Sequence, residues 1–296
     1  MKNILVLGAN SYVGYYLARQ LNSKNKVVGL SRKEVHELEN ITQVVGDPLN
    51  VALIGDLVKK HHIQIVINCV CIGNVDQCER EPDVALKINY EHVENLVGLS
   101  EVMNFKLIHF SSNAVYCGDR PEYSEESLKE PKNYYGKVKA MADDLIKKEL
   151  SEFLLIRVMT LYGPKKEFHR ANPASMIIKA LEEDKPLKLV NDLFGNLLFI
   201  GDLVSFVDEA IIRGFSGEFN IAGDDIVSRH ELGLLVCELM EKPMSLISAC
   251  ASDEFPSLAP RAYNTSFDNT KVKSALNKNS MTPIKTGLLK TLKGYV

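Results

Sequence analysis

Short apolar runs alternate with amphipathic helical patterns through the first half of the chain. Strand-like runs occupy 2–7, 26–30, 43–45, 63–70, 105–111 and 153–158. Apolar side chains recur at helical spacing over 12–22, around 53–57 and from 82 to about 103. Because strands that alternate with helices of this length pair in parallel through right-handed crossovers, the sequence predicts an α/β fold with a doubly wound parallel sheet.

A glycine turn joins the first predicted strand to the first predicted helix. The residues of this turn are Gly8, Ala9, Asn10, Ser11, Tyr12, Val13 and Gly14. Glycine at the strand end permits a tight turn, the helix N-terminus offers unpaired N–H groups to a pyrophosphate, and Gly14 lets the helix approach the sheet closely. The alternative is a plain strand-to-helix turn. Its position after a strand and before a helix favours a Rossmann-type dinucleotide site.

Regular patterning weakens after residue 158. Irregular polar stretches cover 118–132 and 164–173, and short strand-like runs at 188–190 and 218–221 are mixed with helical patterns. We therefore expect an NAD(P)-binding Rossmann domain at 1–163 with an interleaved segment at about 197–222. A smaller C-terminal α/β substrate lobe is expected at 164–196 and 223–296.

The residues after the second strand indicate which dinucleotide binds. An acidic side chain at this place accepts from a ribose 2′-hydroxyl, but here Ser31 is followed by Arg32 and Lys33. This pattern suits a 2′-phosphate and favours NADPH over NADH, which stays open as an alternative because the pattern also fits an exposed basic turn. Asp47, after the third strand, is a candidate partner of the adenine amino group or a turn-starting aspartate before Pro48.

Tyr135 and Lys139 stand four residues apart in a predicted helix and therefore share one face. A tyrosine with a reference pKa of about 10 is a poor proton shuttle near neutrality, and an adjacent ammonium stabilises its phenolate. The alternative is a half-buried tyrosine beside a solvated lysine. Ser112 lies at the end of a strand, where the ligands of a doubly wound sheet bind. The three side chains form a candidate catalytic group.

Charge and hydropathy exclude several other classes. The chain has 35 basic and 38 acidic side chains, with no basic run long enough to follow a nucleic acid. It has no apolar stretch of the roughly 18 residues that a membrane helix needs, and its start is too short an apolar run for a secretory signal. Its six cysteines lack metal-ligand spacing, and we expect Cys69 and Cys71 to be buried thiols in a strand. We therefore expect a cytoplasmic protein without a metal.

Taken together, these motifs resemble those of the extended short-chain dehydrogenase/reductases, and among them the dTDP-4-dehydrorhamnose reductase family. The likeness covers nearly the whole chain. Besides the residues above, it rests on Asn68 to Cys71, Asn74 to Asp76, Glu79, Glu81-Pro82, Asn89, Arg157, Leu161 to Gly163, Asn191-Asp192, Phe194-Gly195, Gly201 to Leu203, Pro260-Arg261, Phe267-Asp268 and Lys271.

The resemblance implies roles for individual residues. Tyr135 is implied to be the proton donor, Ser112 the hydroxyl that binds the substrate carbonyl, and Lys139 a ribose contact. Arg261 is implied to contact the nucleotide diphosphate. Further contacts are implied for the cofactor at Cys69, Val70 and Cys71 and for the substrate at Asn113 and Asn191.

The implied activity is NADPH-dependent reduction of a nucleotide-diphosphate-linked 4-keto-6-deoxyhexose in polysaccharide biosynthesis, such as the dTDP-rhamnose pathway. Asn113 and Ala114 stand where related dehydratases carry extra acid and base groups, so dehydration is disfavoured. A nucleotide-sugar 4-epimerase, or a non-catalytic NADP-binding regulatory subunit of the same fold, stays open, and a homodimer is one possible assembly.

Overall fold

A central parallel sheet organises the first half of the chain, as the alternating pattern predicts. The computed structural model describes residues 1–255 and 257–296. Seven strands follow the order β11-β6-β5-β4-β1-β2-β3, and the pairings from β3 through β5 are parallel. Their bounds are β1 Asn3–Leu7, β2 Lys26–Ser31, β3 Thr42–Val45, β4 Ile65–Asn68, β5 Lys106–Ser112, β6 Phe153–Val158 and β11 Gly217–Ile221.

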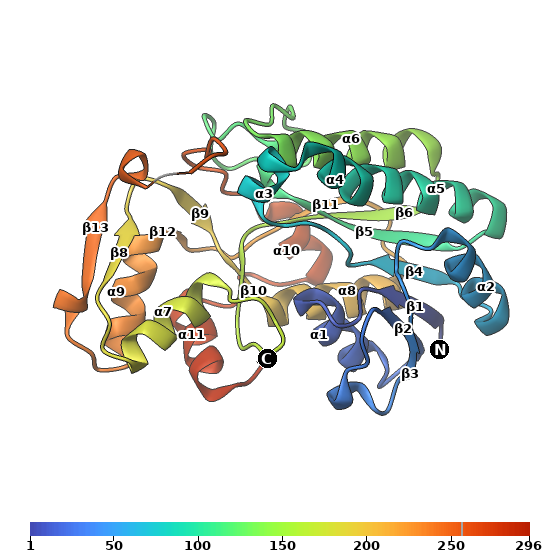
Figure 1. The fold of residues 1–296 in the computed structure, drawn as a ribbon, viewed down its shortest axis with the longest axis horizontal. Coiled ribbons are helices and arrows are strands. Elements are labelled where there is room, and N and C mark those ends of the chain that lie inside the picture. Colours follow the sequence, from blue (N-terminus) through green and yellow to red (C-terminus); the bar gives the residue numbers. More distant parts are fainter. Residues whose placement is uncertain (256) are drawn as a thin grey trace. The chain divides into compact units, whose positions relative to one another are not determined.

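Helices cover both faces of this sheet (Figure 1). On one face α2 packs on α5, and α5 on α6. The ion pair of Lys24, which follows α1 in the chain, with Asp208 of α8 has a length of 2.8 Å. The helix bounds are α1 Tyr12–Leu21, α2 Val51–His61, α3 Val75–Arg80, α4 Pro82–Leu86, α5 His92–Met103, α6 Tyr134–Glu149 and α8 Ile200–Arg213. The predicted doubly wound α/β fold is confirmed.

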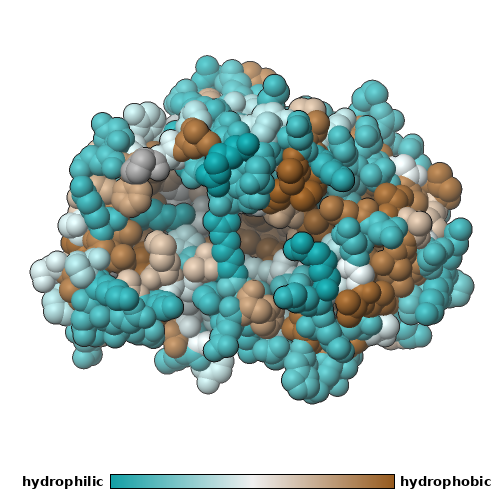
Figure 2. Space-filling view, viewed as in Figure 1, coloured by the Kyte–Doolittle hydropathy of each residue, from teal (hydrophilic) through white to brown (hydrophobic). Residues whose placement is uncertain are grey.

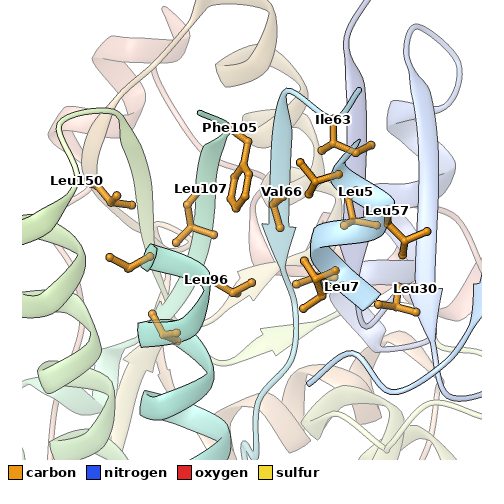
Figure 3. Close-up of a cluster of buried hydrophobic side chains, with 14 of the residues drawn as sticks. Leu5, Leu7, Leu30, Leu57, Ile63, Val66, Leu96, Phe105, Leu107 and Leu150 are labelled. Carbon is orange, nitrogen blue, oxygen red and sulfur yellow. The ribbon is translucent and has the colours of Figure 1, made fainter. Parts of the chain in front are cut away.

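Aliphatic side chains fill the space between the sheet and its covering helices. Figure 3 shows Leu7, Val66 and Leu107 from three neighbouring strands pointing toward Leu57 of α2 and Leu96 of α5. All five side chains are almost fully buried. Burial of each leucine or valine of this kind stabilises the fold by about 1.5–3 kcal/mol, so this core fixes the strand ends that carry the polar residues.

The chain divides into two compact units. The first comprises 1–112, 133–157 and 204–219, and the second comprises 113–132, 158–203 and 220–296. In the second unit, β7 Leu161–Tyr162 pairs with β10 Leu198–Phe199, β8 Leu187–Val190 with β13 Ile247–Cys250, and β9 Phe194–Asn196 with β12 Ile226–Ser228. Its helices are α7 Pro173–Glu182, α9 Arg229–Leu239, α10 Thr270–Leu276 and α11 Ile284–Lys293.

The long helix that the sequence predicts from Pro82 is interrupted. One turn, at 87–91, has π geometry between α4 and α5 and places Asn89 inside the protein. On the face drawn in Figure 2, hydrophilic side chains cover most of the surface, with apolar side chains interspersed. Among the described residues, no helix combines the length and apolar character needed to cross a membrane.

Candidate active site

The turn between β1 and α1 brings two glycines into contact. Gly8 has a φ of 76°, in the left-handed region that favours glycine. A Cβ on Gly14 would lie 2.2 Å from the Gly8 carbonyl oxygen, so a larger residue requires the backbone to shift. The two glycines therefore let the first turn of α1 close onto the end of β1, which is the arrangement that presents helix N–H groups to a phosphate.

Ser11 caps this helix. Its Oγ accepts a hydrogen bond from the Gly14 backbone at 3.1 Å, and its own N–H donates to the Gly8 carbonyl at 2.8 Å. A glycine at position 11 would lack the cap. Asn10, Ser11, Tyr12 and Val13 are all partly accessible, so the turn offers an open side to a ligand.

Substitution of Gly14 tests whether the close approach of α1 to the end of β1 requires a glycine. We expect Gly14→Ala to lower the free energy of unfolding by about 1–3 kcal/mol, because the added methyl group overpacks the turn. Gly98 in α5 is the matched control, since a Cβ there meets nothing within 4 Å. Gly98→Ala should raise stability by about 0.5–1 kcal/mol. Chemical denaturation of both variants measures the difference, and equal effects would show that Gly14 is not sterically required.

The carboxyl ends of β2 and β3 are followed by the residues expected at the adenine and its ribose. The Ser31 Oγ donates to the Lys33 carbonyl at 2.7 Å, which turns the chain and leaves Arg32 and Lys33 exposed. Asp47 is exposed, and its Oδ1 accepts from the Leu49 N–H at 3.0 Å. Asp47 thus starts a turn, which is one of the two roles that the sequence offered for it.

Ser112 and Tyr135 meet where β5 ends and α6 begins. Ser112 is the last residue of β5 and is buried, while Tyr135 lies in the first turn of α6 and is half-buried. The Tyr134 N–H donates to Glu79 Oε1 at 2.8 Å, and Asn133 caps the helix, so this first turn is held at two points. A hydrogen bond links the Ser112 and Tyr135 side chains. The structure therefore brings together the predicted hydroxyl pair.

Lys139 lies one turn further along α6 and is buried. Its Nζ donates to the Phe110 carbonyl at 2.6 Å and lies 3.2 Å from His109 Nε2. His109 is in turn 3.3 Å from Asn68, measured from its Nδ1 to the amide nitrogen. Burial lowers the pKa of Lys139, because a buried ammonium loses its hydration. His109 is a contact that sequence reasoning missed, although an imidazole inside an apolar strand was a visible signal.

The pKa of Tyr135 is raised in the ligand-free protein. Burial is the main cause, and the neighbouring Cys71 acts in the same direction, while the Ser112 hydrogen bond lowers the pKa. The lysine spacing predicts the opposite direction, toward neutrality. Burial outweighs that expectation because a phenolate loses more hydration than a phenol, so the side chain stays protonated in the free protein.

A buried ion pair holds α6 against the sheet. The Arg157 side chain, on β6, is almost fully buried and donates from Nε to Asp143 Oδ2 at 2.8 Å. A second nitrogen of Arg157 pairs with Glu218, whose carboxylate also accepts from Lys147 at 2.6 Å. Asp143 lies four residues after Lys139, so the pair fixes the same helix face that carries the candidate catalytic side chains. In the sequence, the signal for this buried ion pair was Arg157, a charged residue within the apolar strand predicted at 153–158.

Substitution of Arg157 tests the contribution of its buried ion pair with Asp143. We expect Arg157→Met to lower the free energy of unfolding by about 3–5 kcal/mol, because it leaves the Asp143 carboxylate buried and unpaired. Lys285→Met breaks the exposed pair with Glu238 and should cost no more than about 1 kcal/mol. Urea denaturation compares the two variants. If Arg157→Met lowers the free energy of unfolding as little as Lys285→Met does, the buried ion pair does not hold α6 against the sheet.

The segment after β4 differs from the prediction. The strand ends at Asn68, whose Oδ1 accepts from the Val70 N–H at 3.1 Å and turns the chain out of the sheet. Cys69 is therefore half-buried and Cys71 exposed, so the expected pair of buried strand thiols is wrong. Asn89 fixes the following loop, since its side chain accepts from the Ile72 N–H at 2.9 Å and donates to the Ile72 carbonyl.

Three of the predicted substrate contacts lie in the second unit. The Asn113 side chain donates to Thr265 Oγ1 at 2.7 Å, which joins two distant segments of that unit. Asn191 is exposed at the end of β8, and Arg261 is half-buried. An amide and a guanidinium are suitable donors to phosphate or sugar oxygens.

The doubly wound sheet, the glycine turn and the Ser112, Tyr135 and Lys139 group are the features of an extended short-chain dehydrogenase/reductase. A family model, that of the RmlD substrate binding domain, matches residues 1–295, and the chain belongs to this family.

Known proteins are similar to this chain over nearly the full length of both sequences. The chain is 27% identical over 275 residues to the spore coat polysaccharide biosynthesis protein SpsK of Bacillus subtilis, covering 89% of this chain and 88% of that protein. It is 24% identical to a dTDP-4-dehydrorhamnose reductase of Aggregatibacter actinomycetemcomitans, covering 93% of each. A crystal structure of dTDP-4-dehydrorhamnose reductase from Bacillus anthracis in complex with NADP has the same fold, with a TM-score of 0.86, 22% identity and 99% of both chains covered.

Proposed function

We propose that this chain is an NADPH-dependent oxidoreductase that reduces the keto group of a nucleotide-diphosphate-linked 4-keto-6-deoxyhexose. The observation that carries the proposal is the contact of Ser112 with Tyr135, one helical turn from Lys139, at the carboxyl end of a strand in a dinucleotide-binding sheet. The names of the relatives support a nucleotide sugar of polysaccharide biosynthesis as the substrate.

The glycine turn and the ends of the neighbouring strands fit a dinucleotide. Gly8 and Gly14 leave a cradle that a Cβ would fill, and Arg32 with Lys33 supplies exposed positive charge at the end of β2. When bound, NADPH supplies the hydride. The proposed cofactor contacts are Gly8, Asn10, Ser11, Tyr12, Val13, Gly14, Ser31, Arg32, Asp47, Cys69, Val70, Cys71 and Lys139. NADH is the alternative reductant.

Tyr135 is suited to donate the proton that reduction requires. Burial keeps its phenol protonated, so the side chain can transfer a proton to the alkoxide that develops at the carbonyl oxygen. The Ser112 hydroxyl can donate a hydrogen bond to the same oxygen, which stabilises the developing charge. Lys139, buried beneath Tyr135 on the same helix face, contacts the ribose in this proposal.

The remaining polar residues serve the sugar nucleotide in this proposal. Asn113 and Asn191 offer amides to the substrate, and Arg261 offers a forked donor to the diphosphate. The proposed substrate lobe covers 164–196 and 223–296, and the proposed cofactor domain covers 1–163 with about 197–222.

A panel of dTDP-, UDP- and GDP-linked keto sugars tests the activity. We expect NADPH oxidation with at least one member, and Tyr135→Phe should lower turnover by about 100-fold or more without weakening NADPH binding, because only the proton donor is lost. Tyr134→Phe, at the neighbouring position, is the matched control and should keep its turnover.

Two outcomes would contradict the proposal. Unchanged turnover in Tyr135→Phe would remove this residue from the mechanism. Tight NADPH binding without oxidation by any keto sugar would point instead to a regulatory cofactor-binding subunit.

Arg32→Ala tests the preference for NADPH. The loss of a charged donor to the 2′-phosphate should raise the KM for NADPH by roughly tenfold, with little effect on the KM for NADH. Lys26→Ala is the control, because Lys26 lies at the exposed start of β2 and Arg32 follows the other end of that strand. Steady-state kinetics with both cofactors measures the ratio, and an equal rise for both would show that Arg32 does not read the 2′-phosphate.

A further inference from the structure

Arg229 carries a guanidinium group that the protein partly buries without a partner. It is the first residue of α9 and directly follows β12. Its Nη1 is buried and has no hydrogen-bond partner among the described residues. Burial lowers the pKa of Arg229 to about 10, and no described charged side chain contributes to the shift. The group therefore stays positively charged at neutral pH, although burial removes part of its hydration.

Two acidic residues close to Arg229 in sequence or in strand register are already engaged. Glu231 accepts from the Ser228 N–H at 2.7 Å, and the Ser228 Oγ accepts from the Glu231 N–H at 3.1 Å. This reciprocal cap also satisfies N–H groups at the start of α9. Asp192 accepts from the backbone N–H and from the hydroxyl of Ser252, both at 2.9 Å. These two carboxylates are therefore committed to other groups, and Arg229 is not their partner.

The chemistry of the guanidinium indicates what its partner is. A buried charge without a partner is costly, and a methionine of similar length would fill the same space without this cost. A guanidinium presents five N–H donors in a planar fork, which matches the oxygens of a phosphate or a carboxylate. Because no described carboxylate of the chain acts on Arg229, we expect its partner to be an anion that binds to the protein.

The strand register brings Arg229 and Arg261 to the same end of β9. β12 runs antiparallel to β9, and its last residue lies opposite Phe194, so the chain continues past the start of β9 at Arg229. On the other edge of β9, Asn264 pairs with Phe194 in parallel, and the Phe194 N–H donates to the Tyr263 carbonyl at 2.7 Å. Arg261 comes two residues before Tyr263, so the chain leads from Arg261 into this pairing at the start of β9.

The spacing of the strands lets the two arginines share one ligand. Neighbouring strands lie roughly 4.8 Å apart, so the segments on the two edges of β9 are separated by about 10 Å. Asn191, three residues before Phe194, precedes the same end of β9, and all of these residues belong to the second unit. We propose that Arg229 and Arg261 together bind the diphosphate of the sugar nucleotide at the start of β9.

The inference deepens the proposed reductase function and rests on it for the identity of the substrate. The diphosphate of a sugar nucleotide carries two negative charges, which two guanidinium groups neutralise. Each group can donate two hydrogen bonds to one phosphate, so the pair distinguishes a diphosphate from a single phosphate or an uncharged sugar. Arg229 is in this sense a substrate-binding residue that no sequence motif indicates, because its burial depends on the packing of the second unit.

Calorimetric titration of the full chain without cofactor tests the proposal. The probes are dTDP, UDP and GDP, and we expect at least one of them to bind. Arg229→Met should weaken the binding of that nucleotide by about tenfold or more, because hydrogen bonds between charged groups are lost. Arg213→Met is the matched control, since it removes the same charge from an exposed position at the end of α8. Its affinity should equal that of the unsubstituted protein.

A stability measurement separates ligand binding from a structural role. Because the described protein groups leave Nη1 of Arg229 unpaired, Arg229→Met should leave the urea midpoint of the free protein unchanged or raise it. Arg229→Lys keeps the charge but not the planar fork, so it should bind the nucleotide with an affinity between those of the unsubstituted protein and Arg229→Met.

Several outcomes would overturn the proposal. It fails if none of the three nucleotides binds, or if Arg229→Met binds as tightly as the control does. It also fails if Arg229→Met lowers the urea midpoint, since the arginine would then have a partner within the protein. A loss of affinity for NADPH in place of the nucleotides would assign Arg229 to the cofactor and overturn it equally. None of these measurements uses a keto sugar, so failure of the proposed reductase activity would be seen separately in the sugar panel.

Discussion

The buried pair of Arg157 and Asp143 determines where α6 lies on the sheet. Burying two charges costs several kcal/mol per ion unless they face each other with good geometry, so positions of the helix that separate Asp143 from Arg157 are disfavoured. Tyr135 and Lys139 share the Asp143 face of this helix at four-residue spacing. The placement of one ion pair therefore sets the position of two candidate catalytic side chains against the end of β5.

The same burial sets the electrostatics of the site. The pKa values of Tyr135 and Lys139 are both shifted toward the neutral form, because burial removes hydration from the charged form of each side chain. The phenol of Tyr135 therefore keeps its proton in the free protein. This is the state from which a reductase starts, and it connects the packing of α6 to the proposed direction of the reaction.

Local patterns were sufficient for much of the fold and for the position of the candidate site. Alternating strand and helix signals predicted the doubly wound sheet, because a parallel pairing leaves few other arrangements for such elements. The glycine turn was predicted from backbone sterics, since the φ of Gly8 favours glycine and the contact at Gly14 leaves no room for a Cβ. The end of β4 was predicted wrongly, because an asparagine side chain that caps a strand leaves no periodic signal.

The sequence by itself determined the order of the elements, the turn that suits a phosphate, and the spacing that puts Tyr135 and Lys139 on one helix face. These depend on backbone sterics and on helical periodicity, which act between near neighbours. Only the tertiary structure decided which groups surround them. His109 reaches Lys139 from a different element, and Asn68 contacts His109 from a third, so these surroundings depend on packing between segments far apart in the chain.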